Sequence, residues 1–281
     1  MLRTSLLALG LCLTFLAGAK PGPSLVDDIL NLSSIKLSID NIPNQMSQFP
    51  ALMPVEGEEK SKFSNAFFNE MSESFNEAEA LSQIRDHVLQ FGREAELAEV
   101  KAWLQSSVGR RATQAELLLQ GQDPKGVHAI MQSFDENILD EDRRRALKAI
   151  VAQAQVGELM FEMLERMMEP TLQALVESRI VSIESTQARD EYQQNFSLKL
   201  NRMRHHLQPV FDRQILALFA FTYGDLSLQE LQAFAAFSGS KAGQHYYQIT
   251  NSAFVDVSVG WMTRALPKVI GLKASTQIAA D

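Results

Sequence analysis

The sequence FAAFSGSKAGQHYYQ, residues 234–248, is informative about the fold because it places a helix end and a helix start within a few residues. An apolar helical face runs up to Phe237, and Gly239 can adopt the left-handed conformation that ends many helices. Ser240 can then accept a hydrogen bond from the first turn of the next helix. Gly243 has no Cβ, so the preceding helix can pass close to it. The stretch predicts a helix–corner–helix unit; a glycine–serine turn that binds an anion is the alternative.

The same pattern occurs earlier, in ELAEVKAWLQSSVGRRA, residues 96–112. A shift of 134 residues, from Ser106 to Ser240, also aligns Gly109 with Gly243 and brings the apolar positions into register. The aligned apolar pairs are Leu97 with Leu231, Val100 with Phe234 and Trp103 with Phe237. Because apolar and corner positions match together, we predict an internal duplication with structural corners at both serine–glycine pairs.

Helical periodicity extends along the rest of the chain. Two long apolar series step by three or four residues, the spacing of one helix face. They are Phe63, Phe67, Met71, Phe75, Ala78, Leu81, Ile84 and Val88, and then Tyr246, Ile249, Ala253, Val257 and Trp261. Period-two alternation, which is typical of strands, is hard to find. We therefore predict an all-α protein with helix N-caps at Ser33, Ser227 and Ser240, and a capping box from Ser227 to Glu230.

The duplication and the linker composition divide the chain into five segments. We predict a signal peptide over 1–19, an N-terminal helical repeat over 20–122 and a connecting segment over 123–138. A C-terminal helical repeat follows over 139–268, and a flexible tail over 269–281. The junction between the N-terminal repeat and the connecting segment is marked by Gly121 and Pro124, residue types that favour turns.

The N-terminus has the pattern of an export signal. A short basic start precedes an apolar run over 6–16, and small residues follow at 17–19. The run is too short to span a bilayer, so we predict cleavage after Ala19 and no transmembrane segment in the mature chain. The single cysteine, Cys12, lies within this signal, so the mature protein has neither thiol nor disulfide. The net charge of −8 argues against nucleic acid as a partner.

The segment DLSLQELQAFAAFSGSKAGQHYYQ, residues 225–248, resembles the signature of the bacterial exported family catalogued as domain of unknown function 2059. Members of that family end in an acidic-capped helix, a Ser-Pro-x-Gly-Gln turn and a final amphipathic helix. The matching positions are Ser240, Gly243 and Gln244. Lys241 stands in place of the proline. The resemblance covers residues 185–267 and extends to the earlier copy at Ser106 and Gly109. It implies two divergent copies in tandem in an all-α periplasmic protein of a Gram-negative bacterium, and it supplies no catalytic residues.

A methionine-rich stretch with Met160, Met163 and Met167 is a candidate binding face. Thioethers three and four residues apart on one helix face could hold Cu(I), since soft ligands select this ion. Methionine also fills gaps in helical cores, and the neighbours Leu159 and Phe161 favour a core or a partner-binding surface. No two histidines are spaced four residues apart, so we predict no metal site and no cofactor.

No motif in the sequence predicts catalysis. Ser33 and Lys36 satisfy the Ser-x-x-Lys pattern of some acyl-transfer enzymes, but the companion motifs are missing. Acidic clusters such as 140–142 lie at predicted helix starts, where negative charge suits the helix dipole. The basic cluster 143–145 is interpreted as a solvated helix face.

These observations favour an exported binding or interaction module over an enzyme. Its apolar groove would accept a peptide, a lipid or a protein partner. The alternative is a periplasmic enzyme that acts on an envelope polymer or ester. An enzyme requires buried polar side chains with perturbed pKa values that converge in one pocket, and this feature separates the two hypotheses.

Overall fold

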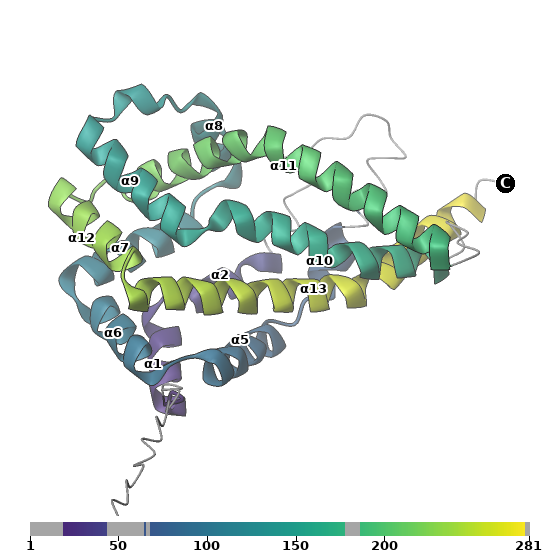
Figure 1. Ribbon diagram of the computed structural model, residues 1–281, viewed down its shortest axis with the longest axis horizontal. Helices are drawn as coiled ribbons and strands as arrows, with labels where there is room; N and C mark the ends of the chain where they lie inside the picture. The colour runs from purple at the N-terminus through teal and green to yellow at the C-terminus, as the bar shows by residue number, and fades with distance from the viewer. Residues whose placement is uncertain (1–18, 44–64, 66–67, 178–185, 279–281) are drawn as a thin grey trace, which may run out of the picture.

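The chain forms helices throughout the part that the structure describes. The computed structural model describes residues 19–43, 65, 68–177 and 186–278, and in these ranges no β-strand occurs. This finding confirms the predicted all-α fold. The helices, labelled as in Figure 1, are α1 (Pro23–Leu32), α2 (Ile35–Asp40), α5 (Glu77–Phe91), α6 (Glu94–Gln105), α7 (Ser107–Gln120), α8 (Pro124–Ser133), α9 (Glu141–Ala154), α10 (Val156–Glu177), α11 (Thr186–Thr222), α12 (Leu228–Ser238) and α13 (Lys241–Ile278), with a 3-10 helix at Glu136–Ile138.

Three long helices run along the length of the molecule (Figure 1). α10 lies between α11 and α13 and packs against both. The shorter helices α6, α7 and α12 gather at one end, while α5 and α6 pack against α13. Within the described ranges, every helix is too short or too polar to cross a bilayer.

Two hydrophobic clusters form the core. The first joins α1, α2, α5 and α6 to α13, and Val26 and Leu97 are fully buried in it. The second gathers α9, α11 and α12, with Leu147 and Leu231 fully buried. Because α13 completes the first cluster, residues of the predicted N-terminal and C-terminal repeats share one core.

Two stacked aromatic rings join the clusters. Trp103 on α6 and Phe237 on α12 pack against both clusters. Their ring centroids lie 4.5 Å apart and their planes differ by 8°. These two residues are aligned with each other in the predicted duplication, so the two corner segments meet at this pair.

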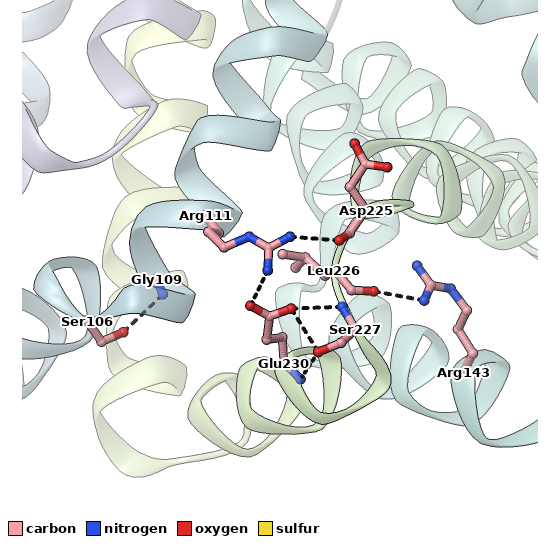
Figure 2. Close-up of polar contacts among 8 residues, drawn as sticks. All are labelled: Ser106, Gly109, Arg111, Arg143, Asp225, Leu226, Ser227 and Glu230. Carbon is pink, nitrogen blue, oxygen red and sulfur yellow. Dashed lines mark hydrogen bonds and ion pairs between the residues drawn. The ribbon is translucent and has the colours of Figure 1, made fainter.

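The two corner segments form the same local hydrogen bonds. The Ser106 hydroxyl accepts from the Gly109 N–H at 3.0 Å (Figure 2), and the Ser240 hydroxyl accepts from the Gly243 N–H at 3.0 Å. A Cβ added at Gly109 would lie 2.0 Å from a backbone oxygen, and one at Gly243 would lie 2.2 Å from the aligned oxygen. Both glycines therefore let the preceding helix end pass close to the new helix. The duplication itself stays a prediction from the sequence.

Two predicted helix ends are wrong in detail. Gly239 ends α12 in the right-handed region, at φ −83° and ψ −6°, and not in the left-handed one. The right-handed conformation suffices because the N–H of Ser240 reaches the carbonyl of Phe237 directly. Ser33, predicted as an N-cap, is instead the C-cap of α1, because α1 continues to Leu32. Its hydroxyl donates to the Leu30 carbonyl, and Ser34 stands at the N-cap of α2. The capping box that begins at Ser227 is confirmed.

The predicted segment boundaries do not all coincide with helix boundaries. The connecting segment 123–138 contains α8 and the 3-10 helix, and Asp123 caps α8 by accepting from Gly126 N–H. α13 continues past residue 268 to Ile278. The predicted signal peptide lies outside the described residues, apart from Ala19.

The turn between α11 and α12 is fixed by an arginine of α9. Arg143 is half-buried, and its guanidinium donates to the carbonyl oxygens of Tyr223, Gly224 and Leu226 at 2.7–2.9 Å. Figure 2 shows the bond to Leu226, with Arg111 bound to Glu230 on the opposite side. The solvated face predicted for 143–145 is therefore wrong for Arg143, because a distant turn supplies it with carbonyl acceptors.

Arg143→Met is expected to lower the free energy of unfolding by about 2 kcal/mol, since charge-assisted hydrogen bonds are worth roughly 1.5–3 kcal/mol. Arg145 is the matched control because its side chain is 69% exposed and, within the described part of the chain, its ion pairs are with Glu141 and Asp142 of its own helix. Arg145→Met should change stability by less than about 0.5 kcal/mol. Urea unfolding of both variants measures the difference, and equal losses would contradict the assignment.

A buried histidine links α13 to the start of α6. The Nε2 atom of His245 accepts a hydrogen bond from the Arg93 backbone N–H at 3.1 Å, which requires an unprotonated nitrogen. Burial lowers the pKa of His245 from 6.5, and the nearby Arg93 charge lowers it further. Its stabilising contribution should be present above about pH 6.5 and lost as the pH falls through the folded-state pKa. At neutral pH the unmodified protein should therefore have a higher free energy of unfolding than His245→Gln, and this difference should shrink as the pH is lowered. A difference that does not change with pH would contradict the lowered pKa of His245.

Candidate functional site

A cavity of about 450 Å³ lies where the corner segments meet α11 and the start of α13. Seven aromatic residues line it, with apolar and hydroxyl side chains between them. They are Trp103, Phe219, Tyr223, Phe234, Phe237, Tyr246 and Tyr247. Three of the four tyrosines of the chain are in this set. A tyrosine offers an apolar ring and a polar hydroxyl, so this wall combines apolar area with hydrogen-bonding groups.

The cavity also contains a carboxyl group. Glu116 on α7 is half-buried, and its Oε2 accepts a hydrogen bond from the Ser34 hydroxyl at 2.6 Å. Its Oε1 accepts from the Tyr223 hydroxyl at 2.8 Å. Burial raises the pKa of Glu116, and the two hydrogen bonds oppose this effect without cancelling it. Among the described residues, no lysine, arginine or histidine forms an ion pair with Glu116.

Local helical spacing places these groups together. Ala112 and Glu116 are four residues apart on α7, so they lie on one face of that helix. Phe219 lies in the last turn of α11 and Tyr223 directly follows that helix, and their rings form an edge-to-face pair at 5.5 Å. Tyr223 continues the aromatic wall to Phe234, with centroids 5.2 Å apart. The aromatic wall is thus built from residues of α6, α11, α12 and α13 and of the turn after α11, and α7 contributes Glu116.

The tyrosine hydroxyls of the cavity stay protonated at neutral pH. Burial raises the pKa of Tyr223 well above 10, and the neighbouring Glu116 charge raises it further. Burial likewise raises the pKa of Tyr247 to about 12 and that of Tyr246 above its usual value. Tyr247 shares a hydrogen bond of 3.1 Å with the buried Ser238 hydroxyl. Glu116 is therefore the cavity group whose charge changes first as the pH is varied.

A larger polar groove of about 860 Å³ lies between the 3-10 helix, α9 and α11. Its charged groups compensate one another: Lys148 donates to Glu136 at 2.8 Å and holds the pKa of that carboxyl below its usual value. The cavity beside Glu116 lacks such compensation in the described residues. We therefore take the smaller cavity as the candidate site.

The residues predicted from the sequence have different positions relative to this cavity. Gly109 lines it, whereas Ser106, Ser240 and Gly243 stay at the helix starts described above. On α10, Met163 is half-buried and Met167 is buried, and neither lines the cavity. The side chain of Met160 lies outside the described part. Among the described residues, no group of three or more histidine, cysteine, aspartate or glutamate side chains is placed to hold a metal ion.

Glu116 and Tyr223 were not predicted from the sequence as site residues. The available signal for Glu116 was its position on the α7 face that also carries Gly109 and Ala112, where an apolar residue is expected. No comparable signal existed for Tyr223, because its role depends on contact between α7 and α11.

The free energy of unfolding of Glu116→Gln, compared with that of the unmodified protein, is expected to be higher at pH 8 than at pH 4.5. The folded-state pKa of Glu116 lies above the unfolded-state value of 4.5, so its contribution to stability is fully present below that pH. The contribution is lost as the pH rises through the folded-state pKa, whereas glutamine does not titrate. Urea unfolding from about pH 4.5 to 8 measures the difference between the two proteins, and a difference that stays constant would contradict the raised pKa.

Comparison with protein-family models, with curated proteins and with solved structures finds no match to this chain. The resemblance to the domain of unknown function 2059 family therefore remains a prediction from the sequence. The function of the cavity has to be inferred from its own geometry.

Proposed function

We propose that this protein is an exported helical binding module that holds a small apolar ligand in the cavity beside Glu116. The supporting observation is the aromatic wall around a volume of about 450 Å³. Ligand sites in proteins typically have volumes of roughly 300–1,000 Å³ and combine apolar walls with a few polar groups. Export to the periplasm is supported by the signal-like pattern over 1–19.

The cavity narrows the predicted range of ligands. A peptide helix or a folded partner needs an extended groove, whereas this volume suits a lipid-like small molecule or part of one. Trp103, Phe237 and Tyr223 supply apolar area, while hydroxyl groups fix the orientation of a polar end. Binding of such a ligand is the function that the geometry supports best.

The test uses N-phenyl-1-naphthylamine, a neutral apolar dye whose fluorescence rises in apolar surroundings. Val156 lines the cavity and is 37% exposed, so Val156→Trp should obstruct entry without altering the buried core. We expect the unmodified protein to bind the dye, and Val156→Trp to bind it about tenfold more weakly. Val210→Trp is the matched control, because Val210 is 50% exposed on α11 and does not line the cavity. Equal binding by both variants, or no binding at all, would contradict the proposal.

A second candidate function is an enzyme that acts on an envelope ester or polymer. The favouring observation is that Ser34, Glu116 and Tyr223 converge in one cavity and that the pKa values of Glu116 and Tyr223 are shifted. Glu116 could accept the proton of the Ser34 hydroxyl, which lies 2.6 Å away. Hydrolysis of 4-nitrophenyl acetate and butyrate tests this candidate. Activity that is lost in both Ser34→Ala and Glu116→Gln would support it, and a rate equal to that in buffer would exclude it for esters.

A further inference from the structure

The carboxyl group of Glu116 lacks a counter-charge among the described residues that line the cavity. It receives two hydroxyl donors, from Ser34 and Tyr223, and no cationic side chain among the described residues pairs with it. Taking a carboxylate out of water without a counter-charge is costly, so burial disfavours the charged form of Glu116 and raises its pKa. A bound cation would remove that cost.

The walls around Glu116 specify which cations fit. Small metal ions are strongly hydrated and need several oxygen ligands, whereas the cavity provides one carboxyl group. An alkylated ammonium ion is weakly hydrated, and its methyl groups gain from contact with apolar surface. Aromatic rings attract such ions through their negative faces, and aromatic cages recognise quaternary ammonium groups in this way. Trp103, Tyr223, Tyr246 and Tyr247 all line the same space.

We propose that the ligand of this cavity carries an organic ammonium group, whose positive charge pairs with the Glu116 carboxylate against the aromatic wall. The inference rests on the proposed binding function and names the ligand class for the same site. An anionic ligand is disfavoured because its charge would oppose Glu116. A neutral ligand would leave the Glu116 carboxyl group without a counter-charge.

Binding of an ammonium ion should lower the pKa of Glu116, and it should release a proton at any pH at which Glu116 is protonated before the cation binds. Among the described residues, the titratable groups that face Glu116 are Tyr223, directly after α11, and, further away, Tyr246 and Tyr247 from α13. Ser34, beside α2, contributes a hydroxyl. The tyrosines stay neutral near pH 7, so among these described groups Glu116 is the one whose protonation can change when the cation binds. Affinity for the cation should therefore increase with pH until Glu116 is ionised in the empty protein.

The experiment compares choline with 3,3-dimethyl-1-butanol, its neutral isostere with carbon in place of nitrogen. Isothermal titration calorimetry of the full chain should show choline binding at least about tenfold more tightly than the isostere. Glu116→Gln should weaken choline binding by about tenfold or more and abolish its pH dependence. Glu99→Gln, at an exposed position on α6, is the matched control and should leave affinity unchanged. Titrations in buffers with different ionisation enthalpies should show proton release.

The outcomes separate this inference from the proposed function. If the dye N-phenyl-1-naphthylamine binds but choline does not, or binds no better than its isostere, the cavity is an apolar site and the ammonium inference is overturned. If choline binding persists unchanged in Val156→Trp or in Glu116→Gln, the cation lies elsewhere and the inference is also overturned. If neither dye nor choline binds, both the inference and the proposed function fail.

Discussion

Gly109→Ala and Gly243→Ala are each expected to lower the free energy of unfolding by about 3 kcal/mol, the upper part of the range for inserting a methyl group into packed structure. A Cβ at Gly109 would lie 2.0 Å from the carbonyl oxygen of Trp103. One at Gly243 would lie 2.2 Å from that of Phe237. These neighbours are backbone atoms at the end of the preceding helix, so relief requires the two helices of the corner to move apart. Urea unfolding monitored by circular dichroism measures the loss.

The chain provides a matched control in Gly126. Like Gly109 and Gly243, it is the third residue of its helix, and its N–H donates to the N-cap side chain, here Asp123. The nearest atom to an added Cβ is an oxygen of that side chain at 3.8 Å, which is an ordinary contact. Gly126→Ala should therefore be neutral or raise stability by up to about 1 kcal/mol, since alanine favours helix. A similar loss of stability at all three glycines would show that the loss comes from the position at the start of a helix and not from close contact with the preceding helix.

Trp103→Ala is expected to cost about 3 kcal/mol or more, as is typical when a large aromatic side chain is removed from a packed site. Trp103 packs against both hydrophobic clusters and stacks on Phe237, so its loss opens space between the two halves of the core. Trp103→Phe keeps an aromatic ring and should lose less. Phe91→Ala is the control for aromatic removal at the surface, because Phe91 is 51% exposed and should cost less than about 1 kcal/mol.

Unfolding of Trp103→Ala also tests how the two clusters depend on each other. Since the stacked pair lies between them, we expect the variant to unfold at lower denaturant concentration, in one transition seen equally by far-ultraviolet circular dichroism and by tyrosine fluorescence. Two separate transitions would show that the clusters unfold independently. No loss of stability would show that the stacked pair does not stabilise the fold.

The apolar series from Phe63 to Val88 shows how far the sequence prediction reached. It correctly places Met71, Ile84 and Val88 in the core. It also predicts one face of a long helix with room for an interruption, and the chain does turn at residues 74–76 before α5 begins. The indole N–H of Trp261 donates to the Met71 carbonyl at 3.1 Å beside this turn. That contact could not be predicted, because the two residues lie on helices far apart in the chain.

The all-α fold and several helix starts follow from the amino-acid sequence. Periodicity, the Ser227 capping box and the side-chain bonds from Ser106 and Ser240 act within a few residues, so their geometry follows from local sequence. Tertiary structure alone decided the environment of Glu116 and the role of Arg143. Desolvation of a carboxyl group and the supply of distant carbonyl acceptors depend on which helix faces meet, and local spacing carries no information about that.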